Sequence, residues 1–122
     1  MNEADVKRNI VKDFKVRGNY ARRIEDAYSV GFPDLILIPK DYPVFFTEAK
    51  IIKGQTFGPT DRQYVEMTRL AISKYSVPVI IGWKERVHYL HEYAKSVTIE
   101  QCLAQQPDEN IVDFFKRFYN ER

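Results

Sequence analysis

Two carboxylates and a lysine occur in an order that suits chemistry on a phosphate ester. Asp34 follows the chain breaker Gly31-Phe32-Pro33 and opens an apolar run, while Glu48 and Lys50 lie two residues apart in the next apolar run. If both runs are strands, Glu48 and Lys50 point to the same side, because strand side chains alternate between faces. An acid-x-lysine pair alone is more often a surface ion pair, and the preceding breaker and strand make it more specific.

A hairpin centred on Asp41 would bring the two acids together. In that register Ile36 lies opposite Phe46, and Asp34 lies opposite Glu48. Directly opposed residues have Cβ atoms about 5 Å apart, a distance at which like charges destabilise the pair. A divalent cation between the carboxylates removes that repulsion, and hard cations such as Mg²⁺ prefer oxygen ligands. We therefore predict a divalent-cation site at this end of the hairpin.

An acid-acid-lysine cluster of this kind suits phosphodiester hydrolysis. A bound cation polarises a phosphoryl oxygen and lowers the pKa of a water molecule. The ammonium of Lys50 can orient that water or neutralise charge that develops in the transition state. Loss of the lysine should therefore lower the reaction rate more than it lowers metal binding.

The spacing of apolar residues predicts the elements that hold this cluster. An amphipathic helix is expected after Asn2, which can cap it, and before Gly18, which can end it. A second helix should begin after Thr60. Strands are expected at 20–27, 34–38, 44–50, 77–83 and 86–90, a loop at 54–59, a short helix at 98–104 and a terminal helix around 111–118. This order predicts an α/β domain with helices covering a central sheet.

The composition is that of a small folded domain. The chain has 122 residues, 44% of them hydrophobic, which favours one domain spanning residues 1–122. Neither a secretory signal nor a membrane segment is evident, so a cytoplasmic protein is expected. The lone Cys102 cannot form an internal disulfide, which agrees with a reducing compartment.

Positive charge is concentrated near the start of the chain. The net charge is only +2, yet the first 23 residues hold seven basic and three acidic side chains: Lys7, Arg8, Lys12, Lys15, Arg17, Arg22 and Arg23 against Glu3, Asp5 and Asp13. Such a segment can face phosphates, or it can be the solvated face of a helix. Taken alone, the charge pattern favours the solvated face.

The motifs together resemble a known nuclease family. Gly31-x-Pro33-Asp34, then Glu48-Ala49-Lys50, then a glutamine in the next helix are similar to the PD-(D/E)xK nuclease superfamily, and most of all to its VRR-NUC branch of virus-type replication and repair nucleases. The similarity runs from about residue 3 to about residue 83. It implies a restriction-endonuclease-like core with a central mixed β-sheet flanked by helices. It also implies that Asp34 and Glu48 bind Mg²⁺ or Mn²⁺, that the Ala49 carbonyl adds a ligand, and that Lys50 assists the attacking water.

The family also places an acidic residue of the first helix at the metal. Glu3 is the candidate, because it lies three residues before Val6 and seven before Ile10 and so shares their helix face. An acid in the first turn can equally serve to complement the helix dipole. Glu25 is the alternative third acid.

Other residues have a role by resemblance and an ordinary structural one as well. Gln63 would lie near the metal, although Thr60-Asp61-Arg62-Gln63 also spells a capping box. Arg22 and Arg23, with Lys53, are candidates for contacting the DNA backbone. Neighbours on a strand diverge, so only one of the two arginines should face phosphate.

The resemblance implies a metal-dependent DNA endonuclease of phage or prophage type acting in the bacterial cytoplasm. Stand-alone domains of this kind resemble resolvases that cut four-way junctions, and a two-fold substrate suits a homodimer. Catalytic residues would be Asp34, Glu48, Lys50 and Gln63. The alternative from another class is a catalytically inactive nucleic-acid-binding or assembly module that retains the fold.

Overall fold

The structure, a computed structural model, describes residues 1–24 and 31–122. The helices are α1 (Glu3–Val16), α2 (Asp61–Leu70) and α3 (Ile111–Asn120), with one 3₁₀ turn at Ile99–Gln101. The strands are β1 (Tyr20–Arg23), β2 (Leu35–Ile38), β3 (Val44–Ile51), β4 (Thr56–Phe57), β5 (Ser76–Lys84), β6 (Val87–Glu92), β7 (Val97–Thr98) and β8 (Leu103–Ala104).

A six-stranded mixed sheet forms the centre of the fold. Its strand order is β1-β2-β3-β5-β6-β8, and β3 and β5 pair in parallel while the other neighbours are antiparallel. Parallel neighbours require a crossover connection, and α2 lies in the segment that joins them. Strands β4 and β7 form a separate two-stranded sheet. The predicted class, an α/β fold with a central mixed sheet flanked by helices, is confirmed.

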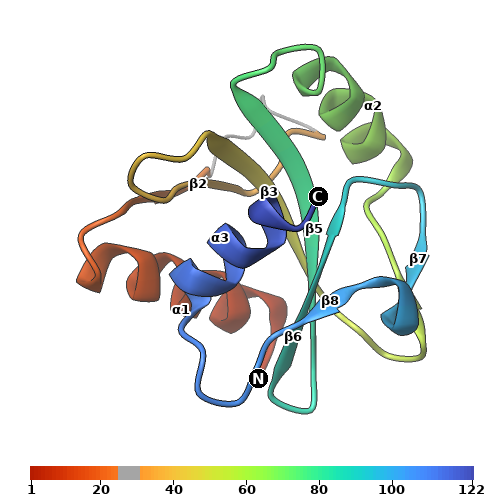
Figure 1. The fold of residues 1–122 in the computed structure, drawn as a ribbon. Coiled ribbons are helices and arrows are strands. Elements are labelled where there is room, and N and C mark those ends of the chain that lie inside the picture. Colours follow the sequence, from red (N-terminus) through yellow and green to blue (C-terminus); the bar gives the residue numbers. More distant parts are fainter. Residues whose placement is uncertain (25–30) are drawn as a thin grey trace.

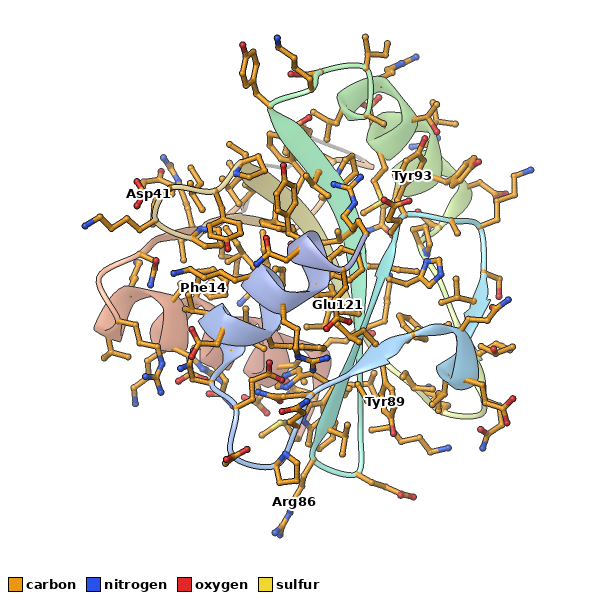
Figure 2. The ribbon with its side chains drawn as sticks, in the orientation of Figure 1. Phe14, Asp41, Arg86, Tyr89, Tyr93 and Glu121 are labelled. Atoms are coloured by element: carbon orange, nitrogen blue, oxygen red, sulfur yellow. The ribbon has the colours of Figure 1, made fainter. Side chains whose placement is uncertain are left out.

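Helices α1 and α3 cover one face of this sheet (Figure 1). The ring of Phe115 lies 5.3 Å from that of Phe14 and 5.2 Å from that of Phe45, so one aromatic residue joins both helices to β3. Figure 2 shows Phe14 on α1 beside α3. A smaller cluster on the opposite face includes Met67 of α2 and Ile80 of β5. The sheet is therefore buried on both faces near its centre.

The hairpin register predicted from Asp41 is the one found. Ile36 pairs with Phe46, and Leu37 pairs with Phe45. Asp41 has φ = 67° and lies at the tip of the β2–β3 turn (Figure 2). Asp tolerates this left-handed conformation better than most residues, which helps to fix the turn and hence the register.

The helix ends also follow the sequence. Asn2 caps α1, Gly18 follows the helix with φ = 78°, and Thr60 and Gln63 form the capping box of α2. The strand expected at 20–27 is described as far as Arg23, and positions 25–27 lie outside the described residues.

Two local predictions are wrong. The expected helix at 98–104 is only a three-residue 3₁₀ turn between β7 and β8, and the expected loop at 54–59 contains β4. Strands of two residues are too short to show an apolar period, and β4 pairs with β7 from a distant part of the chain. As for membranes, none of the helices within the described residues has the length and apolarity to cross one.

Candidate active site

The predicted acidic pair lies where strand β3 extends past the first residue of its antiparallel neighbour β2. The last ladder pair between them joins Leu35 to Thr47, whereas β3 continues to Ile51 beside β5. Phe45 and Ala49 contribute to the core under α1 and α3. Neighbouring side chains on a strand point to opposite faces, so Glu48, next to Ala49, points to the other face. Its partner on β5, Ile80, belongs to the cluster under α2. The site is thus set at the end of the hairpin, on the α2 side of β3.

Asp34 and Glu48 are direct neighbours, as the register requires. The Asp34 backbone N–H donates a hydrogen bond to Glu48 Oε2 over 3.2 Å. The Glu48 side chain is fully buried, with 0% of its surface exposed, while that of Asp34 is partly exposed. A carboxylate so deeply buried beside a second acid is unfavourable for folding unless positive charge compensates it.

Two lysines supply positive charge at the pair. Lys50 Nζ lies 3.6 Å from Glu48 Oε1, on the same side of β3, as strand alternation predicted. Lys7 of α1 contacts Asp34 Oδ2 and lies 3.9 Å from Glu48 Oε1. The Lys7 side chain is only 11% exposed.

Lys7 had no predicted role in the site, although the sequence contains a signal for it. It lies three residues before Ile10 and seven before Phe14, and both of these are buried in the core. Residues at those helical spacings share one face. The same argument that placed Glu3 on the buried side of the helix therefore applies to Lys7.

The environment raises the pKa of Glu48 to about 7. Burial is the largest cause, since it disfavours the charged carboxylate, and the negative charge of Asp34 acts in the same direction. Lys50 and Lys7 lower the pKa, but they do not outweigh the other two effects. These surroundings therefore disfavour the ionised form of Glu48, and a nearby cation would favour it.

The donor set fits one hard cation. Glu48 Oε1 is buried and, among the described residues, lacks a hydrogen-bond partner, so a lone pair is available. Asp34 supplies a second carboxylate next to it. No group of three His, Cys, Asp or Glu side chains suited to a metal occurs in the described ranges. The two adjacent carboxylates are the kind of ligands that hard cations prefer, and binding of Mg²⁺ or Mn²⁺ by them stays a prediction.

For the other predicted ligands and catalytic groups, the structure gives contacts other than with Asp34 or Glu48. Glu3 Oε1 lies 3.8 Å from Lys7 Nζ, and its side chain is 45% exposed. The Gln63 side-chain oxygen accepts a hydrogen bond from the Thr60 N–H, which is its capping role. The Ala49 carbonyl as a ligand, like Glu3 and Gln63 at the metal, stays a prediction. Glu25, the alternative acid, lies outside the described residues.

The predicted DNA contacts are all on the surface. Arg22 and Arg23 are exposed on β1, which is an edge strand of the central sheet, and Lys53 is exposed in the loop after β3. As neighbours on a strand, the two arginines point to opposite faces. Accessibility is necessary for contact with phosphates, and the role itself stays a prediction.

Gly31, three residues before Asp34, packs closely against the backbone of helix α2. Its φ is 87°, and a Cβ at this position would lie 2.9 Å from the backbone oxygen of Arg62. We expect Gly31→Ala to lower the free energy of unfolding by about 2–3 kcal/mol, through backbone strain and a clash with main chain that cannot rotate away. Urea unfolding at equilibrium measures this.

Two other glycines are controls for the Gly31 substitution. Gly18 has φ = 78°, but a Cβ added there would meet nothing within 4 Å, so Gly18→Ala should show the strain alone, about 1 kcal/mol. Gly54 has open space around it and no positive φ, so Gly54→Ala should be nearly neutral. An equal cost at Gly31 and Gly18 would contradict the predicted contact with Arg62.

Comparisons with known proteins agree with this architecture. No protein-family model matches the chain, and no curated protein matches it significantly by sequence. Among solved structures it is similar to Hjc of Archaeoglobus fulgidus, a Holliday junction resolvase from an archaeal hyperthermophile, with a TM-score of 0.66 and 12% sequence identity. The match covers 93% of this chain and 98% of that one. The chain therefore has the restriction-endonuclease-like fold of that resolvase over nearly its whole length.

Proposed function

We propose that this protein is a metal-dependent DNA endonuclease, selective for branched DNA in the manner of a junction resolvase. The observation that carries the proposal is the buried Glu48 carboxylate beside Asp34, with one oxygen that lacks a hydrogen-bond partner among the described residues. Folding alone does not favour such a pair, whereas binding a cation does. The similarity in fold to a Holliday junction resolvase supports the same class of activity.

Each residue of the site would have a separate task. Asp34 and Glu48 hold Mg²⁺ or Mn²⁺ at the end of the hairpin, with Glu3 and the Ala49 carbonyl as further candidate ligands. When bound, the cation polarises the phosphoryl group and makes a water molecule more acidic. Lys50, already beside Glu48, orients the attacking water or stabilises the charge that develops on phosphate.

Substrate binding would use the surface around this cluster. Arg22 or Arg23 on the edge strand and Lys53 after β3 are positioned on the outside of the fold, where they can meet the sugar-phosphate backbone. Gln63 would assist close to the metal. A homodimer matches the two-fold symmetry of a four-way junction. The order of motifs, which resembles the VRR-NUC branch, favours a phage or prophage enzyme acting in the bacterial cytoplasm.

A cleavage panel tests the activity. The substrates are linear, nicked, flapped and four-way-junction DNA, each with Mg²⁺, Mn²⁺ or EDTA. We expect metal-dependent cleavage, fastest on branched DNA, and a loss of roughly 100-fold or more in Asp34→Asn and Lys50→Ala. Lys50→Ala should retain metal-induced thermal stabilisation better than Asp34→Asn does, because the lysine is not a ligand. The matched control is Lys53→Ala, which should weaken DNA binding and leave the cleavage rate at saturating DNA unchanged.

The competing function is a nucleic-acid-binding or assembly module without catalysis. The contact of Lys7 with Asp34 favours it, because an ammonium can neutralise the acidic pair with no metal. Wild-type protein that binds branched DNA, yet cleaves none of the substrates with either metal, would establish this alternative and overturn the nuclease proposal.

A further inference from the structure

We infer that the Lys7 ammonium is a built-in cation of the acidic pair, which a divalent metal must displace to bind. Lys7 would therefore set the metal affinity of the site. This inference rests on the proposed function only in its choice of ligand, a hard divalent cation at Asp34 and Glu48. It goes beyond the proposed function because a residue of α1 would determine how tightly the site binds the divalent cation.

The geometry places Lys7 at the meeting point of the acids. Its Nζ contacts Asp34 Oδ2 and lies 3.9 Å from Glu48 Oε1 and 3.8 Å from Glu3 Oε1. The Nζ of Lys50, by contrast, pairs with Glu48, at 3.6 Å from its Oε1. Only a group lying between the carboxylates can approach all three. A divalent cation held by Asp34 and Glu48 would require the same region of space.

The charges in the cluster make joint occupancy unfavourable. Three carboxylates surround two ammonium groups, so the ionised cluster carries a net charge of −1 (three negative, two positive). A divalent cation added with Lys7 in place would change this to +1 and set two positive centres side by side in a poorly solvated site. Moving the Lys7 ammonium away from the acidic pair separates the two positive centres and so lowers their repulsion.

The surroundings allow Lys7 to move without losing every partner. Glu3 lies one helical turn earlier, and its carboxylate is 45% exposed, at the solvent side of the cluster. The lysine stem has four methylene groups and can turn toward Glu3 while α1 stays docked through Ile10 and Phe14. Glu3 would then hold the displaced ammonium rather than the metal, which gives this acid a role different from that of a third ligand.

Metal affinity in Lys7 variants tests the inference directly. Isothermal titration with Mn²⁺ should show at least about tenfold tighter binding for Lys7→Met than for wild type, since removing an occupant present more than roughly 90% of the time raises the competent fraction by that factor. Lys7→Arg, which retains the charge, should show no such gain. Lys12→Met is the control for net charge, because Lys12 is exposed on the same helix, and it should bind Mn²⁺ like wild type. Equal Mn²⁺ affinity in wild type and a folded Lys7→Met would overturn the inference.

Chemical labelling tests displacement in the unmutated protein. The Lys7 side chain is only 11% exposed, so its ion-paired amine should react slowly with an acetylating reagent. Saturating Mn²⁺ should accelerate its modification severalfold, as read by peptide mass spectrometry. The amine of Lys12 reports on the reagent itself and should be unaffected. Unchanged or slower labelling of Lys7 with Mn²⁺ bound would show that the lysine stays in place, and would contradict displacement.

These readouts fail separately from the proposed function. If no DNA is cleaved but Lys7→Met binds Mn²⁺ more tightly and labelling responds to Mn²⁺, the competition is real and the nuclease proposal is wrong. If branched DNA is cleaved while both readouts are unaffected, the nuclease proposal holds and the role of Lys7 is wrong.

Discussion

Replacing Glu48 by glutamine is expected to stabilise the metal-free protein and to abolish the proposed nuclease activity. The carboxylate is fully buried, and its surroundings raise its pKa from 4.5 to about 7. Glutamine resembles the protonated acid and carries no charge to bury. Above pH 7 the gain should be about 3 kcal/mol in the free energy of unfolding, equivalent to a rise of roughly 10 °C in Tm.

The pH dependence of this gain has a definite sign. Because the pKa of Glu48 is higher in the folded protein, the folded state binds more protons than the unfolded state between pH 4.5 and about 7. The stability of wild type should therefore fall as pH rises through that window and level off above it. Glu48→Gln lacks this dependence, so the difference between the two proteins should be small near pH 4.5 and greatest above pH 7. Urea unfolding in EDTA at several pH values measures it.

A surface acid is the control for Glu48→Gln. Glu92 forms an ion pair with Arg122 and is half exposed, so Glu92→Gln should change stability by no more than about 0.5 kcal/mol at any of these pH values. Mg²⁺ or Mn²⁺ should raise the Tm of wild type and leave that of Glu48→Gln unaffected, so the difference between the two proteins should become smaller. A Glu48→Gln protein less stable than wild type at pH 8 without metal would contradict the stated cost of the buried carboxylate.

The largest loss of stability is expected from Phe115→Ala. The Phe115 ring is fully buried and makes edge contacts with Phe14 of α1, Phe45 of β3 and Phe114 of α3. Truncation removes buried apolar surface and leaves a cavity where two helices and the sheet meet. The expected cost is about 3–5 kcal/mol, which lowers the Tm by roughly 15 °C.

Calorimetry and urea unfolding measure the Phe115 effect, with graded controls. Phe115→Leu fills most of the space and should cost clearly less than alanine. Tyr75→Ala removes an aromatic ring of similar size that is 69% exposed, and it should change stability by less than about 1 kcal/mol. A cost at Phe115 no greater than that at Tyr75 would mean that α3 does not dock on the sheet as described.

The hairpin and its acids could be predicted from sequence because their determinants are local. The turn at Asp41 fixes which residues of β2 and β3 face each other, and strand alternation then sets Asp34 against Glu48 with Lys50 on the same side. The caps at Asn2 and Thr60 are equally local, since each bonds to the backbone N–H three residues later. These features depend on neighbours within about fifteen positions.

What escaped prediction depends on contacts between distant segments. Strand β7 pairs with β4, which comes from a distant part of the chain. Neither β7 nor β8 shows a period of two residues, because each has only two residues. Lys7 reaches a site 27 residues further along the chain. The Lys7 ammonium reaches the acids only because α1 docks on the sheet. In the sequence alone, the charge of Lys7 is therefore indistinguishable from the other charges of a solvated helix face.

Helix α1 has its core residues and Lys7 on the same face. The docking of the helix and the binding of a cation at the acidic pair are therefore linked equilibria. Phe14 and Ile10 bind the helix to the sheet, and Lys7 binds it to the acidic pair. If a cation takes the place of the ammonium, it removes part of what holds the helix, and weaker docking of the helix must in turn favour the cation by the same factor. Cation binding would then weaken the packing of the N-terminal helix, and tighter packing of that helix would weaken cation binding.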